Sequence, residues 1–437
     1  MVVGFYIFRV FMFLKLFAHP RFFILHFAIL CLVPAMAQAE TALRDERRQL
    51  ELPVDERLPE ELQAPGMVYR GFAYAPRLTL QGKYDNNIYA TPTDEKSDYS
   101  LSIQPELTVK KEFSSHKMVF GGKAEIERFA DHSDENKKDY SLFARARLVG
   151  ENHWELPLST SFDKKARDRI TPQITRTGEP EDIKTFNVKV GVRHNFNRFS
   201  LALMDEHKNS EFDDGTDIVT GAPVIYSDND YRRDGVRLES RYEMPGGNHI
   251  LFGDIFYGQY DYDRRDSTTG LSGSRDEYGL MAGVESNYKG LIFSHIGAGG
   301  RRQSFDDSTL DNISILDLQA DIAWNILPKL TLKVAADRNI NQDNGFTQGI
   351  IENIYGIGAD YEFLHNLYFE SDLGYATYDF KGTGRDDTDH SAGIGLKYYN
   401  SRRFETGLSA IWQRRDSNTP AAEFDRTMVM LSLTGKL

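Results

Sequence analysis

The sequence predicts an all-β fold, a transmembrane antiparallel up-and-down β-barrel of about 18 strands (16–18). Three observations indicate this fold. Between residues 71 and 437, segments of about 10–14 residues alternate apolar with polar side chains. The links between these segments are short and long by turns. After residue 39, no segment approaches the roughly 20 continuous apolar residues that a membrane helix needs.

Residues 99–110 show the alternation most clearly. One face of this predicted strand carries Tyr99, Leu101, Ile103, Pro105, Leu107 and Val109. The positions between them hold serine, glutamine, glutamate, threonine and lysine. Similar patterns appear in residues 316–324, 404–413 and 427–437. A period of two gives a strand one apolar and one polar face, as a barrel wall in lipid requires.

Link lengths separate this fold from a soluble β-sandwich, whose strands also alternate. Eight short links, such as 114–116 and 245–248, are interleaved with nine long polar ones. The long links are predicted at roughly 85–98, 131–139, 169–183, 213–230, 264–275, 306–312, 342–349, 381–388 and 416–424. Outer-membrane barrels alternate tight periplasmic turns with extended external loops in this way. We therefore expect both termini on the periplasmic side.

The N-terminus has the pattern of a secretory signal. Its only charged residues before residue 40 are Arg9, Lys15 and Arg21, an apolar run covers 22–30, and Ala37-Gln38-Ala39 ends it. We expect cleavage between Ala39 and Glu40; a retained membrane anchor is the alternative. Residues 40–70 are charged and proline-containing without alternation, which predicts a flexible periplasmic leader before a barrel over 71–437.

Composition narrows the function classes. The formal net charge is −13, and such acidity excludes a nucleic-acid-binding protein, which needs a basic surface. The single cysteine, Cys31, lies in the predicted signal, so the mature chain has no disulfide. Candidate aromatic girdles lie near the strand ends, with general strand propensity as the alternative explanation. Together these features predict a location in a Gram-negative-type outer membrane, with its lipid as a partner.

The first predicted hairpin carries a recognisable motif. A strand runs into Tyr84-Asp85-Asn86-Asn87-Ile88-Tyr89, followed by a short acidic loop and a strand containing Pro105-Glu106-Leu107. This hairpin resembles the opening of the outer-membrane β-barrel porin type 2 family. Because members of that family are often found with exopolysaccharide synthesis and export systems, the resemblance implies passage of a polysaccharide and contact with periplasmic export components. It implies no catalytic residues.

The last predicted strand ends in an amphipathic pattern at Leu437. Such a strand is read by the barrel-assembly machinery, which we expect as a partner during insertion. Phenylalanine is the usual final residue, so Leu437 departs mildly from the pattern.

Charged residues recur on the polar faces of the predicted strands. A charge that faces lipid costs about 2–4 kcal/mol at mid-membrane for Arg or Lys, so we expect these side chains in the lumen. The candidates are Lys110, Glu125, Arg145, Arg147, Lys189, Arg193, Arg237, Glu239, Arg241, Glu243, Asp317, Asp321, Lys333, Asp360, Glu370 and Asp372, with Glu127, Glu285, Asp337 and Glu362 beside them. Mixed signs suit neutral or weakly charged sugars. Solvation and cross-strand pairing alone are the plainer account.

Other chemistry is weakly supported. The acidic clusters at 213–214, 228–230, 306–307 and 386–387 lack the spacing of a calcium loop, so we expect no metal and no cofactor. His207, His295 and His390 stand alone, without a nucleophile-elbow or zinc-protease motif. We therefore expect no enzyme activity.

Two functions remain open from the sequence. The first is a porin-like conduit, and the second is a structural or adhesive barrel with a blocked lumen and functional external loops. Gly356, Gly358, Gly393 and Gly395 are predicted to face inward and leave space, which favours the conduit.

We predict that the mature protein begins at Glu40. N-terminal sequencing or intact-mass measurement of protein extracted from outer membranes checks this. A mass that retains residues 1–39 would instead identify a membrane anchor.

Overall fold

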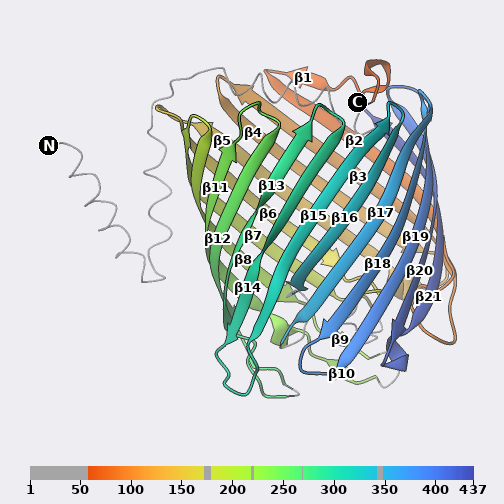
Figure 1. The fold of residues 1–437 in the computed structure, drawn as a ribbon. Helices are drawn as coiled ribbons and strands as arrows, with labels where there is room; N and C mark the ends of the chain where they lie inside the picture. The colour runs from red at the N-terminus through yellow and green to blue at the C-terminus, as the bar shows by residue number, and fades with distance from the viewer. Residues whose placement is uncertain (1–57, 172–178, 218–220, 268, 342–347) are drawn as a thin grey trace.

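The computed structural model describes residues 58–171, 179–217, 221–267, 269–341 and 348–437. Eighteen antiparallel strands close into one barrel, which confirms the predicted fold class and strand number (Figure 1). The predicted signal and most of the predicted leader lie outside the described residues. Within the described residues, no helix has the length and hydropathy to span a bilayer.

The barrel strands are β2 (Phe72–Asp85), β3 (Asp98–Phe113), β4 (His116–Phe129), β5 (Lys137–Val149), β6 (Trp154–Ala166), β7 (Asp182–Phe196), β8 (Phe199–Phe212), β11 (Tyr231–Glu243), β12 (His249–Tyr262), β13 (Arg275–Tyr288), β14 (Ile292–Phe305), β15 (Ile313–Leu327), β16 (Leu330–Asn341), β17 (Ile350–Leu364), β18 (Leu367–Phe380), β19 (Arg385–Tyr399), β20 (Phe404–Ser417) and β21 (Phe424–Lys436). A short strand β1 (Met67–Tyr69) pairs with the start of β2. Strands β9 (Gly215–Thr216) and β10 (Pro223–Val224) form a separate small hairpin in the link between β8 and β11.

Two different rims result from this meander. The short links join strands at the rim that also carries β1 and the C-terminus, here called the turn rim. The long links lie at the opposite rim, the loop rim, at the bottom of Figure 1. Three loop-rim links contain a one-turn 3-10 helix, η3 (Ser133–Glu135), η4 (Ser227–Asn229) and η5 (Pro420–Ala422).

One predicted long link is wrong. The link predicted at 381–388 spans only residues 381–384, because β19 already begins at Arg385. Asp387 pairs with Tyr378 of β18 and accepts a 2.6 Å hydrogen bond from the Ser417 hydroxyl of β20. Its carboxylate is therefore satisfied within the wall, and the acidic pair at 386–387 belongs to a strand rather than to a loop.

The two faces of the wall differ as a lipid boundary requires. On β3, Tyr99 and Leu101 are 65% and 55% exposed, whereas Ser100 and Ser102 between them are buried. The register extends this division to every neighbouring strand, so large apolar side chains stand exposed all round the outer face. Exposed apolar bands of this size are stable only against lipid.

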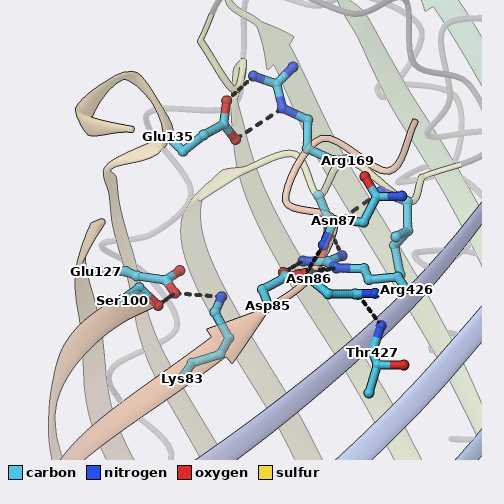
Figure 2. A network of polar contacts seen from close by, with 12 residues as sticks. Lys83, Asp85, Asn86, Asn87, Ser100, Glu127, Glu135, Arg169, Arg426 and Thr427 are labelled. Carbon is cyan, nitrogen blue, oxygen red and sulfur yellow. Dashed lines mark hydrogen bonds and ion pairs between the residues drawn. The ribbon is translucent and has the colours of Figure 1, made fainter. Parts of the chain in front are cut away.

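The first and last strands close the barrel through polar contacts as well as through the ladder. Asp85 at the end of β2 accepts two hydrogen bonds from Arg426 Nε of β21, at 2.9 and 3.1 Å, and both side chains are buried (Figure 2). The backbone N–H of Asn86 bonds the Thr427 carbonyl at 3.1 Å. The Asn87 amide donates to the Asp425 carbonyl at 2.9 Å. Three residues of the hairpin motif are therefore closure residues.

We predict that Arg426→Ala destabilises the barrel strongly. The change leaves Asp85 buried without its cation, which costs about 3–5 kcal/mol. The temperature or urea concentration at which the folded gel band disappears measures this. Lys96→Ala, which breaks the exposed Lys96–Asp94 pair, is the control and is expected to cost less than about 1 kcal/mol. Equal stability of the two variants would contradict a closure role.

Candidate functional site

The inner face is the candidate functional site, since it bounds the only volume that the whole wall surrounds. Strand register places all sixteen predicted lumen candidates on this face: Lys110 on β3, Glu125 on β4, Arg145 and Arg147 on β5, Lys189 and Arg193 on β7, Arg237, Glu239, Arg241 and Glu243 on β11, Asp317 and Asp321 on β15, Lys333 on β16, Asp360 on β17, and Glu370 and Asp372 on β18. They are spread over nine strands and do not form a single cluster.

Two of them, Lys189 and Asp317, are the ends of a belt of alternating charge along the inner wall from β7 to β15. Successive nitrogen–oxygen distances are 2.6, 2.7, 3.8, 3.7 and 2.7 Å through Lys189, Glu206, Arg233, Glu277, Arg301 and Asp317. Sequence reasoning named only the two ends of this belt. The alternation of inward and outward positions along each strand would have identified the other four residues, because each of them lies at an inward position of its strand. The ion pairs of the belt neutralise much of the charge on this part of the inner wall.

Closer to the turn rim, further candidates form separate cross-strand pairs. Arg193 contacts Glu239 at 3.1 Å, and Arg241 contacts Glu285 at 3.0 Å. On the other side of the ring, nitrogen–oxygen distances of 2.6 and 2.7 Å join Lys333 to Asp360 and Lys397 to Glu370. Half-exposed pairs of this kind contribute little stability and leave the wall wettable.

Aromatic rings pack against glycines of the inner wall. A Cβ on Gly279 or Gly283 would come within 2.6 or 2.5 Å of the Phe256 or Phe252 ring, and within 2.6 or 2.0 Å of a backbone carbonyl on the next strand. Phe256 lies between the guanidinium groups of Arg237 and Arg301, at 5.0 and 5.3 Å. These glycines therefore serve the packing of rings that line the lumen.

The four glycines predicted to leave space divide into two kinds. A Cβ on Gly356 or Gly395 would make only ordinary contacts of 3.8 Å or more. A Cβ on Gly393 would collide with the Asp372 carboxylate at 2.3 Å, and one on Gly358 would press on a carbonyl at 3.0 Å. The space beside Gly393 is therefore occupied by the Asp372 side chain and is not empty.

At the loop rim, the segment after β6 reaches across to the far end of the sequence. The carbonyl of Ile170 accepts a 2.9 Å hydrogen bond from Arg415 of β20, and Asp168 lies 3.5 Å from Arg426 of β21. Arg169 donates to Glu135 at 3.1 Å, with both side chains almost fully buried (Figure 2). Six strand steps separate β6 from β20 around the ring. Residues 167–171 therefore form a strap over part of the loop rim.

The hairpin motif supports this strap. The Arg169 guanidinium lies 5.7 Å from the Tyr89 ring, and the Tyr89 hydroxyl donates to Asp134 at 3.0 Å. Burial, together with that hydrogen bond and the acidic neighbours, raises the pKa of Tyr89 well above its ordinary value. Tyr89 therefore stays protonated and keeps its donor at physiological pH.

The link between β8 and β11 is held by its own carboxylate. Asp214 accepts backbone hydrogen bonds from Tyr226 and Ser227, both at 2.8 Å. Desolvation opposes the charge, but these donors outweigh it and lower the pKa of Asp214. Its stabilising effect is present above the ordinary carboxylate pKa and disappears as the pH falls through the lowered value.

At the turn rim, part of the predicted leader packs against the inner wall. The segment contains η2 (Glu60–Leu62), and Leu62 is buried with Leu58 against Tyr368 and Tyr399, which lie on the inner faces of β18 and β19. Arg402 donates from Nε to the Gln63 carbonyl at 3.1 Å. Both mouths of the barrel therefore have chain across part of them.

The three histidines considered for catalysis lie apart. His207 is on the outer face of β8 and contacts Asp234 at 2.6 Å, whereas His295 stacks on Phe252 in the lumen with ring centres 4.6 Å apart. His390 is on the outer face of β19 near Tyr375. Among the described residues, no group of three or more His, Cys, Asp or Glu is placed to hold a metal ion.

The family described as "Putative beta-barrel porin 2" matches residues 60–437. Comparison with curated proteins finds no match. Among solved structures, Pseudomonas aeruginosa OpdK with vanillate aligns at 12% identity over 83% of this chain and 99% of its own, with a TM-score of 0.44. P. aeruginosa OccK2 (OpdF) aligns at 11% over 84% and 98%, TM-score 0.47, and Acinetobacter baumannii OccAB3 at 10% over 83% and 99%, TM-score 0.47.

We predict that Glu135→Gln frees the strap. The change removes the negative charge from the buried Arg169–Glu135 pair, so amide hydrogen exchange across 167–171 should become about tenfold faster or more. Hydrogen-exchange mass spectrometry measures it. Asp213→Asn, which loosens only the neighbouring exposed Lys184–Asp213 pair, is the control and should leave the strap unchanged. Identical exchange in all three proteins would show that the strap is held by other contacts.

Proposed function

The chain belongs to the beta-barrel porin 2 family, as an outer-membrane porin-like channel, and we propose that its lumen conducts a surface polysaccharide or its saccharide units. The observation that carries the proposal is the inner face, which is charged or hydrophilic along most of its height. A hydrophilic solute exchanges water for polar side chains on such a wall at little cost. Eighteen strands also enclose a lumen too wide for wall side chains alone to fill.

One sector of the inner wall suits a saccharide chain in particular. From β17 to β21 the inner positions are rich in small residues, namely Gly356, Gly374, Ser391, Gly395, Gly407, Ser409 and Ser432. Small side chains widen the lumen on this side, and their hydroxyl and backbone groups offer weak hydrogen bonds of both polarities. Repeated weak bonds hold a sugar chain without trapping it.

The orientation belongs to the proposal. Loops of the loop rim face the exterior, and the turn rim, with the segment around Leu62, faces the periplasm. In that orientation the strap lies at the external mouth and Leu62 at the periplasmic one. Periplasmic export components would then meet the turn rim, and the cargo would leave past the strap.

A structural or adhesive barrel is the second candidate. It is favoured by one observation, the presence of chain at both mouths: the strap at the loop rim and Leu62 against Tyr368 and Tyr399 at the turn rim. If these segments close the lumen in the membrane, the external loops are left as the functional surface.

We predict that the purified full-length protein forms ion-conducting channels in planar bilayers. Neutral oligosaccharides added to one chamber should reduce the current reversibly as they enter the lumen. Glu135→Gln should raise the current through the open channel or make it fluctuate more, because the change loosens the strap. A silent barrel under all conditions would reject the conduit and favour the structural role. A deletion strain with normal surface polysaccharide would reject the polysaccharide cargo alone.

A further inference from the structure

A cavity of about 270 Å³ lies on the inner wall between β4 and β8, beside the Lys189 end of the charge belt. Three cations line it, Lys117, Arg145 and Arg147, together with Val119, Ala146, Pro157, Leu158, Ser159 and Met204. No carboxylate is part of this lining. The contrast with the neighbouring small cavity is direct, because that one holds Glu206 and Glu239 beside its cations.

The two arginines of this cavity are not neutralised by the wall. Within the described residues, neither Arg145 nor Arg147 forms an ion pair, and Arg147 Nε is buried without a hydrogen-bond partner. Lys117 has a carboxylate neighbour, Glu112 at 3.2 Å, in a pair with both side chains exposed to solvent. Burying part of a guanidinium without an acceptor costs free energy, which a bound anion would recover.

Two inner glycines shape the cavity. The Phe143 ring packs against Gly121, where a Cβ would come within 2.3 Å of it, and the Arg145 guanidinium lies 5.1 Å from the centre of that ring. Met204 of β8 lies over Gly191 of β7, where a Cβ would meet its sulfur at 2.1 Å, and so reaches the cavity. The aromatic ring limits the positions of Arg145, so the cationic wall is partly ordered before any ligand arrives.

The opposite wall is strongly acidic. In the ring of eighteen strands, β16 lies nine steps from β5 in either direction. The inner faces of β15–β18 carry one lysine, Lys333, and eight carboxylates: Asp317, Asp321, Asp337, Glu352, Asp360, Glu362, Glu370 and Asp372. The inner faces of β3–β6 carry both signs in nearly equal number, with Lys110 and Lys123 beside Glu106 and Glu125. An anion in the lumen is therefore repelled more strongly by the β15–β18 wall than by the wall that holds Arg145 and Arg147.

We propose that this cavity is an anion-binding subsite of the lumen, which takes the carboxylate or phosphate group of a passing solute, such as an acidic saccharide. The proposal rests on the proposed conduit for its physiological use but not for its existence. The arginines supply planar paired donors that match an oxyanion, and Lys117 supplies a third cation at the rim. The sequence predicts a lumen suited to neutral or weakly charged sugars, and the proposed subsite adds a preference for acidic sugars at this wall.

Current block by three probes tests the subsite: glucose, glucuronate and glucose phosphate, each added to the full-length protein in planar bilayers. Wild-type channels should be blocked more strongly by the two anionic sugars than by glucose. Arg145→Gln/Arg147→Gln should weaken the anionic block by about tenfold or more and leave the glucose block unchanged. Arg145→Lys/Arg147→Lys should retain an intermediate block, because charge survives without the paired donors.

Arg77→Gln is the matched control. It removes one positive charge from the inner face of β2, outside the cavity, and should leave the anionic block close to that of wild type. Folding of each variant is checked by heat-dependent gel mobility. Equal block by glucose and glucuronate in wild type, or an anionic block that survives Arg145→Gln/Arg147→Gln, would overturn the subsite while the conduit stands.

Titration calorimetry in detergent separates the two proposals. It measures glucuronate and glucose phosphate binding whether or not the barrel conducts. A silent channel that still binds both anions, and loses them in Arg145→Gln/Arg147→Gln, would reject the conduit and keep the subsite. No binding to wild type would reject the subsite. Preference for one of the two probes identifies the oxyanion, carboxylate or phosphate, that the subsite is built for.

Discussion

The barrel depends on one constraint: no backbone N–H or C=O may be left unpaired in hydrocarbon. Every strand meets this by pairing with both neighbours, but β2 and β21 must find each other from opposite ends of the sequence. The hairpin motif and the residues around Arg426 lie where that pairing ends, and Asp85 holds them together. The same corner supports the strap through Arg426 and Tyr89, so closure and the architecture of the loop rim share residues.

The distribution of charge follows from the closed wall. Because the apolar side chains face the lipid, most of the charged side chains along the strands face the lumen. Most of them neutralise one another in the belt and in cross-strand pairs. Arg145 and Arg147 on one side and Asp321 and Asp372 on the other have no ion pair within the described residues. The two arginines line a cavity without a carboxylate, so their charge is available to a ligand.

Much of the fold was predictable from the sequence, because strand alternation and link lengths are local signals with a direct physical cause. The alternation of residues along the strands likewise placed Arg145 and Asp372 on the inner face. Interactions between distant residues were not predictable. No local sequence pattern predicts that Arg415 donates to Ile170 or that Leu62 packs on Tyr368, because these contacts depend on how the ring of strands closes. The short link at 381–384 was missed for the same reason, since partners on β18 and β20 make its acidic residues acceptable in a strand.

The pairing of β2 with β21 also has a consequence for the time course of assembly. The two strands are at opposite ends of the barrel sequence, so their contact is the one with the largest separation along the chain. Contacts of such high order form slowly, since a long loop must close before any bond is gained. Until the last strand arrives, β2 presents an open edge, which is prone to pairing with other chains. The interval before closure is therefore when the nascent barrel most needs a chaperone.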